Sequence, residues 1–169
     1  IESMAKLRPA FKKDGSVTAG NASGLNDGAA AVVLMEASAA AAKGLKPMAK
    51  MLGYATAGVE PSIMGTGPIP AVRKLLDKQS LKIEDIDIWE SNEAFAAQAL
   101  SVTNELALDP EKVNPNGSGI GLGHPIGATG AIMSVKALYE LRRTGGRYAV
   151  ATMCIGGGQG IAVLFENYP

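Results

Sequence analysis

The chain is poor in the two side chains that most often bind transition metals. Its 169 residues contain one cysteine, Cys154, and one histidine, His124. A single cysteine cannot form an internal disulfide, which favours a reducing compartment, so we expect a cytoplasmic location. One histidine and one cysteine do not make a zinc site, and no metal is expected.

Net charge and long apolar runs are also missing. Sixteen basic residues balance sixteen acidic ones, which gives no reason to expect nucleic acid or an anionic membrane surface as a partner. No apolar run approaches the length of a membrane span, and the start of the chain lacks the apolar core of a signal peptide. Phosphate-loop, dinucleotide-binding and Gly-x-Ser-x-Gly patterns are absent. Hydrophobic residues make up 47% of the chain, enough for a globular core.

Glycine is abundant, and one glycine-rich stretch, residues 116–130, contains the only histidine. Pro125 follows His124 directly, and a long apolar-periodic run comes next. Because proline is well tolerated at the first helical position, the pattern predicts that His124 lies at a helix N-terminus. The helix dipole there would favour a neutral imidazole, able to accept a proton or donate a hydrogen bond. A histidine that only caps the helix fits the same pattern.

Two further polar residues lie at the ends of predicted elements. Asn92 stands where a strand-like run meets a helix-like run, so it is either an N-cap, a functional side chain, or both. Cys154 ends a strand-like run and is followed by four glycines in six residues. It is either a buried inert thiol or an acid–base group beside backbone N–H groups that could bind an oxyanion.

Apolar periodicity predicts an α/β fold with a sheet covered by helices on both faces. The last two strands are close enough in sequence to form an antiparallel hairpin, expected at a sheet edge. Residues 29–43 fit this alternation poorly. The expected strands are 29–35, 48–54, 86–89, 113–119, 148–154 and 161–166, and the expected helices are 38–43, 71–79, 92–106 and 131–143.

Three motifs, taken together, resemble those of the thiolase family. They are Asn-Glu-Ala-Phe from Asn92, Gly-His-Pro-Ile-Gly-Ala around His124, and Cys-Ile-Gly-Gly-Gly-Gln-Gly from Cys154, in the family's order. The resemblance implies the C-terminal half of a thiolase, with a mixed, mostly parallel sheet. Residues 1–46 would be the end of the loop domain with the last strand and helix of the N-terminal domain, and residues 47–169 the C-terminal domain.

The resemblance also implies roles for individual residues. His124 is similar to the histidine that activates a nucleophilic cysteine and polarises the thioester oxygen. Asn92 is similar to the asparagine that holds a water in the same oxyanion hole. Cys154 resembles the cysteine that moves a proton on and off the α-carbon of the second acyl group. Gly156 resembles the glycine whose N–H serves the other oxyanion hole.

The substrates implied are acetyl-CoA and acetoacetyl-CoA, with coenzyme A thioester as substrate and no permanently bound cofactor. Ser23 resembles a serine near the pantetheine arm, although composition by itself favours a plain turn for residues 20–28. Phe95 resembles a wall of the acyl pocket, although an aromatic at helical spacing also fits the core.

The resemblance departs from the family in one respect. The family's nucleophilic cysteine lies in the first half, whereas this chain's one cysteine is Cys154. The chain also begins with Ile, which suggests a fragment, a processed chain or missing upstream residues. We therefore expect an acetyl-CoA C-acetyltransferase that is active only with an N-terminal half, and homo-oligomeric when complete. The alternative is a non-catalytic acyl-CoA-binding or assembly module of thiolase fold.

Overall fold

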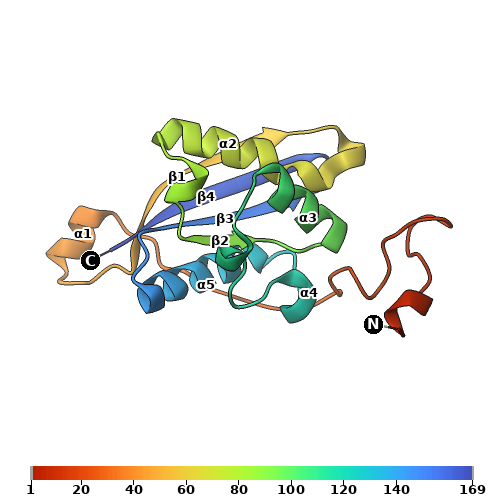
Figure 1. The fold of residues 1–169 in the computed structure, drawn as a ribbon. Helices are drawn as coiled ribbons and strands as arrows, with labels where there is room; N and C mark the ends of the chain where they lie inside the picture. Colours follow the sequence, from red (N-terminus) through yellow and green to blue (C-terminus); the bar gives the residue numbers. More distant parts are fainter. Residues whose placement is uncertain (1, 169) are drawn as a thin grey trace.

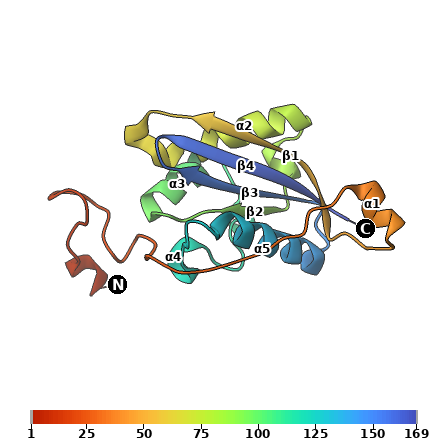
Figure 2. The same ribbon diagram turned by 180° about the vertical axis from the view of Figure 1, so that it is seen from behind.

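A computed structural model of the chain describes residues 2–168. It contains one four-stranded sheet with helices on both faces (Figures 1 and 2). The strands are β1 (Ala49–Gly58), β2 (Ile88–Ser91), β3 (Tyr148–Ile155) and β4 (Gln159–Asn167), in the order β1-β4-β3-β2. The α/β class is as expected from the sequence.

The sheet is mixed, but it is not mostly parallel as the family resemblance implied. Strand β4 pairs antiparallel with both β1 and β3, and only β2 and β3 are parallel. The β3–β4 hairpin is confirmed, with Cys154 opposite Gly160. It occupies the centre of the sheet instead of an edge, because β1 adds to the free side of β4.

Three helices cover the sheet. Helices α2 (Pro68–Gln79) and α3 (Ala96–Glu105) lie on one face, and α5 (Thr129–Thr144) lies on the other (Figure 1). Each begins or ends within a few residues of the predicted position. Helix α5 ends at Gly145, whose φ of 72° is the left-handed conformation that terminates helices.

The core lies mainly between the sheet and α2 with α3. The side chains of Leu75, Trp89 and Leu164 are almost completely buried there. A smaller cluster joins α5 to the other face of the sheet. No helix within residues 2–168 is long and apolar enough to span a membrane.

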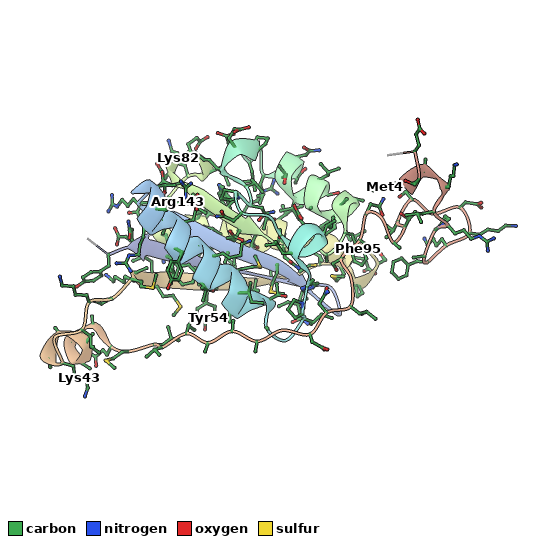
Figure 3. All side chains as sticks on the ribbon, turned by 90° about the horizontal axis from the view of Figure 1, so that it is seen from below. Met4, Lys43, Tyr54, Lys82, Phe95 and Arg143 are labelled. Carbon is green, nitrogen blue, oxygen red and sulfur yellow. The ribbon has the colours of Figure 1, made fainter. Side chains whose placement is uncertain are left out.

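The predicted strand at residues 29–35 does not form. This segment is extended but exposed, and it runs past α5 without a strand partner (Figures 2 and 3). A strand needs a neighbouring edge for its backbone hydrogen bonds, and both edges of the sheet lie elsewhere. The helix that follows is present as α1 (Ala37–Ala42), and Gly44, with φ 64°, lies just beyond its end.

The predicted strand at residues 113–119 is reduced to a single bridge between Val113 and Trp89. Asn114 follows with a left-handed φ of 48°, which ends any extended run. A short helix, α4 (Gly119–Leu122), takes up the remainder. The 3-10 turns are η1 (Met4–Lys6), η2 (Pro61–Thr66), η3 (Ile83–Asp85) and η4 (Pro110–Lys112).

Candidate active site

The candidate site lies at the carboxyl ends of β2 and β3. Because these strands are parallel, both end at the same edge of the sheet, where α/β proteins commonly place their sites. Asn92 directly follows β2, and its backbone N–H donates to the carbonyl of Thr152 at 3.0 Å. Cys154 is two residues beyond Thr152 on β3. The sheet therefore brings Asn92 and Cys154 to one edge.

Asn92 does not cap the following helix. Helix α3 begins at Ala96 with Phe95 as its N-cap, so the capping interpretation of Asn92 is wrong. The Asn92 side chain is 1% exposed, and its Nδ2 lies 3.3 Å from Nε2 of His124. The amide is thus directed across the site, away from the helix terminus.

His124 precedes its helix by a turn. Pro125 is not the first helical residue, because α5 begins only at Thr129. The residues between them form a turn in which the Pro125 carbonyl accepts the N–H groups of Ala128 and Thr129. The imidazole Nδ1 lies 2.7 Å from the hydroxyl oxygen of Thr129. Burial lowers the pKa of His124, because desolvation disfavours the charged ring. The direction of this pKa shift favours the neutral imidazole, and its cause is burial, where the sequence suggested the helix dipole.

The backbone of His124 is held from far upstream. Its N–H donates to the Asn26 side-chain oxygen at 3.0 Å, and Leu25 forms a parallel bridge with His124. Gly123 has a φ of 108°, and a Cβ there would overlap the Asn26 side chain. Asn26 was not predicted as a site residue. Its position in a polar loop was visible in the sequence, but its partner was not.

Cys154 is buried, and burial raises the pKa of its thiol. The glycine turn after it uses left-handed conformations at Gly157 and Gly158, with φ 82° and 85°. The Gln159 amide donates to the carbonyl of Gly156 at 3.0 Å, while Gly156 itself is exposed. No hydrogen bond links Cys154 to His124 in residues 2–168, so the two share an edge without direct contact of that kind.

The two predicted substrate-contacting residues lie next to each other. The backbone N–H of Ser23 donates to the carbonyl of Ala94 at 2.9 Å, and Ala22 bridges to Phe95. The Phe95 ring meets Phe11 edge to face, with centroids 5.8 Å apart. Phe95, labelled in Figure 3, thus contacts the N-terminal segment from the start of α3.

A buried ion pair lies next to the site, and the sequence analysis did not predict it. Glu90 is completely buried, and its Oε2 lies 2.7 Å from Nζ of Lys136 on α5. Lys136 also donates to the carbonyl of Gly117. Burial raises the pKa of Glu90, and Lys136 opposes that rise. Glu90 and Asn92 are two residues apart, so in an extended chain their side chains lie on the same face. This spacing was the one signal in the sequence that could have linked Glu90 to the site.

Asn114 and Ser118 hold the loop before His124 against β2. The Asn114 side chain accepts from the backbone N–H of Ser91 at 2.9 Å and donates to its carbonyl at 2.8 Å. It therefore replaces a strand partner at the end of β2. The Ser118 hydroxyl donates to the carbonyl of Ser91 and accepts from the N–H of Glu93. These bonds fix the direction in which Asn92 leaves the strand.

Fold and site together define an α/β domain with histidine, asparagine and cysteine at one sheet edge. Residues 45–167 match the thiolase C-terminal domain, and residues 1–38 match the thiolase N-terminal domain. The chain belongs to the thiolase family.

Several known proteins are closely similar to the chain. The beta-ketothiolase BktB of Cupriavidus necator is 64% identical over 99% of this chain and 43% of its own length. The crystal structure of the Bacillus anthracis acetyl-CoA acetyltransferase superposes with a TM-score of 0.96 at 58% identity, over 98% of this chain and 42% of that one. The crystal structure of human mitochondrial 3-ketoacyl-CoA thiolase in complex with CoA superposes with a TM-score of 0.91 at 45% identity, over 99% of this chain and 43% of that one. The chain thus spans 42–43% of the length of these relatives.

Proposed function

We propose that this chain is the C-terminal part of an acetyl-CoA C-acetyltransferase, which catalyses reversible Claisen condensation of two acyl-CoA molecules. In this proposal residues 47–169 are the C-terminal thiolase domain. Residues 1–46 are the end of the loop domain with the last elements of the N-terminal domain. An N-terminal thiolase half supplies the nucleophilic cysteine, and the complete protein is a homo-oligomer.

The observation that carries the proposal is the pair formed by Asn92 and His124. An amide and an imidazole 3.3 Å apart can together present hydrogen-bond donors to one oxygen atom once the ring has taken a proton at Nε2. Burial lowers the pKa of His124, which favours the neutral ring that can accept a proton. Such preorganised donors act where negative charge develops on a thioester oxygen.

In the acylation step, His124 takes the proton of the partner half's cysteine thiol. The resulting thiolate attacks the thioester carbonyl, the carbon–sulfur bond to coenzyme A breaks, and the departing coenzyme A thiolate takes the proton of the Cys154 thiol. Cys154 is then a thiolate, and His124 keeps the proton that it took at Nε2. An acyl-enzyme and free coenzyme A result. Proton transfer through a positioned imidazole contributes about 10²–10⁴-fold in such steps.

In the condensation step, the Cys154 thiolate removes a proton from the α-carbon of the second acyl-CoA. Burial raises the pKa of Cys154, so the thiolate, once formed, is a stronger base than an exposed one. His124, still protonated at Nε2, and a water held by Asn92 donate hydrogen bonds that stabilise the enolate oxygen. The enolate carbon then attacks the acyl-enzyme carbonyl, whose oxygen is stabilised by the N–H of Gly156. The carbon–sulfur bond to the nucleophilic cysteine breaks, and its thiolate takes back the proton from His124.

Substrate contacts are assigned to Ser23 for the pantetheine arm and Phe95 for the acyl group. The bridge between Ala22 and Phe95 keeps the two assigned contacts adjacent. The steps above use coenzyme A thioesters as substrates and require no permanently bound cofactor.

Reconstitution tests the proposal. The chain is coexpressed with the N-terminal portion of the Cupriavidus necator relative that it does not cover, and acetoacetyl-CoA cleavage by coenzyme A is measured. The pair is expected to turn over, and residues 1–169 alone are expected to be inactive. Asn92→Ala should lower kcat about 10²–10³-fold, whereas Asn104→Ala, on the exposed surface of α3, should leave it unchanged.

Two results would contradict the proposal. One is robust turnover by the isolated chain. The other is a stable complex of the two parts that binds acyl-CoA without turnover, which would identify a binding or assembly module.

A further inference from the structure

The hydroxyl of Thr129 is in contact with two groups at once. Its Oγ1 lies 2.7 Å from Nδ1 of His124 and 2.9 Å from the carbonyl oxygen of Pro125. Thr129 is 4% exposed, so no bulk water replaces either partner. The same carbonyl already accepts the backbone N–H groups of Ala128 and Thr129, which fixes its position in the turn before α5.

The number of hydrogens available decides the protonation pattern. A carbonyl oxygen only accepts, and a hydroxyl has one hydrogen to donate. If that hydrogen goes to Pro125, the second contact is satisfied only when Nδ1 of His124 carries a proton. In the other tautomer, either Nδ1 or the Pro125 carbonyl faces a lone pair of Thr129 at hydrogen-bond distance. Only the Nδ1–H tautomer satisfies both contacts.

We propose that Thr129 is a positioning residue that holds His124 as the Nδ1–H tautomer, leaving the lone pair of Nε2 directed at Asn92 and the site. Residues that fix a tautomer through the far ring nitrogen are a general device of histidine chemistry. Thr129 touches no reacting atom in this role. It acts through the ring.

Asn92 follows the tautomer and does not set it. A carboxamide can present either its NH₂ group or its oxygen to Nε2 by turning about its last bond. In this structure Nδ2 faces Nε2, and the Asn92 Oδ1 is buried without a hydrogen-bond partner. The unpartnered oxygen is a cost of the orientation that an Nε2 lone pair requires.

The assignment of the tautomer follows from the contacts of Thr129 alone. Its consequence for catalysis rests on the function proposed above. A base that takes a proton at Nε2 must have that nitrogen unprotonated at rest. An Nε2–H tautomer would have to exchange its proton before every acylation. A wrong tautomer would therefore lower kcat more than it changes KM.

The single histidine makes the proposal directly measurable. Uniform ¹⁵N labelling of the 169-residue chain gives one pair of imidazole nitrogen signals, and their shifts report which nitrogen is protonated. Above the histidine pKa, the unsubstituted chain and Thr129→Ser should be predominantly Nδ1–H. Thr129→Val should lose that preference and show both tautomers.

Two further variants separate positioning from general damage. Asn92→Ala should keep the Nδ1–H form, because Thr129 remains. Thr144→Val on the same helix removes a hydroxyl that donates to the Glu140 carbonyl and should also keep it. The proposal is overturned if the unsubstituted chain is mainly Nε2–H, or if folded Thr129→Val keeps the Nδ1–H signal. Inactivity of the reconstituted enzyme with a normal tautomer would instead count against the proposed function alone.

Discussion

Residues 2–46 and residues 47–168 are built in opposite ways. In the first segment Ala40 is the one buried residue among those described. In the second, side chains from four strands and three helices form continuous cores. The first segment contacts the second through a few backbone bridges, such as those at Ala22 and Leu25.

The difference shows that hydrophobic sequence is not sufficient for burial. Val33 lies in an apolar run and is 90% exposed, whereas Val150 lies in a similar run and is 0% exposed. Val150 has strands on both sides and helices above and below. Val33 has neither. A contiguous exposed apolar strip of this kind is typical of a protein–protein contact surface, and the N-terminal half proposed above would be its partner.

The sharpest test compares two leucines of equal chemistry. Leu75→Ala should lower the free energy of unfolding by about 2–5 kcal/mol, because Leu75 is completely buried against the sheet. Leu34→Ala should change it by less than about 0.5 kcal/mol, because Leu34 is 73% exposed. Urea unfolding of both variants measures the difference. Equal losses would mean that residues 29–35 are packed after all.

Two glycines give the next largest contrast. A Cβ at Gly160 would overlap the backbone carbonyl of Gly67, whereas a Cβ at Gly121 meets nothing within 4 Å. Gly160→Ala should therefore destabilise by about 1–3 kcal/mol. Gly121→Ala, inside α4, should be neutral or slightly stabilising. Thermal unfolding distinguishes them, and an unaffected Gly160→Ala would show that the backbone at Gly67 does not pack closely on β4.

A smaller effect comes from Glu140, a charged residue inside the packed region. Hydrogen bonds from Arg143 and Asn116 lower its pKa to about 2. A lowered carboxyl pKa stabilises the fold above the unfolded value of 4.5, and that stability is lost as pH falls from 4.5 towards 2.

Glu140→Gln should cost about 1.5 kcal/mol at neutral pH, at the low end for bonds to a charged group because Arg143 is 69% exposed. The variant should also lose part of the fall in unfolding free energy that the unsubstituted chain shows as the pH drops from 4.5 towards 2. Arg73–Glu105 is an exposed ion pair, so Glu105→Gln is the control and should leave the acid limb unchanged. An unaltered acid limb in Glu140→Gln would contradict the assignment.

The smallest expected effect joins the two regions. Asn26→Ala removes the bond from the His124 N–H to the Asn26 side chain and should cost about 1 kcal/mol or less. Hydrogen exchange at the His124 amide should nevertheless accelerate, while that of β3 amides stays unchanged. Asn21→Ala, which loses contacts within the N-terminal loop only, provides the comparison. Unchanged exchange at His124 would show that the segment does not hold the loop.

Local patterns predicted most of the elements but not their partners. The runs at 148–154 and 161–166 are rich in β-forming residues around a glycine turn, so the hairpin was predictable. Its central place was not, because β1, which adds to β4, is about 100 residues upstream. The strand at 29–35 was expected from apolarity alone, and it does not form because no neighbouring strand within residues 2–168 is available to pair with it.

The site was predictable as a set of residues and less so as a geometry. His124, Asn92 and Cys154 were found from their type and position at element ends. The hydrogen bond between Asn92 and His124 displaced the capping role, since capping preference is a local rule and the bond is tertiary. Asn26 lies 98 residues from His124, and no spacing rule links such residues.

The central position of β4 has a consequence for how the chain is made. Among the described residues, strand β1 pairs only with β4, and β4 is synthesised about 100 residues after β1. About 100 residues are therefore synthesised while both backbone edges of β1 remain unpaired. Unpaired strand edges are prone to pair with other chains. The sheet is therefore completed only after β4 has been synthesised, and a nascent chain that stops before β4 lacks the strand to which both β1 and β3 bind.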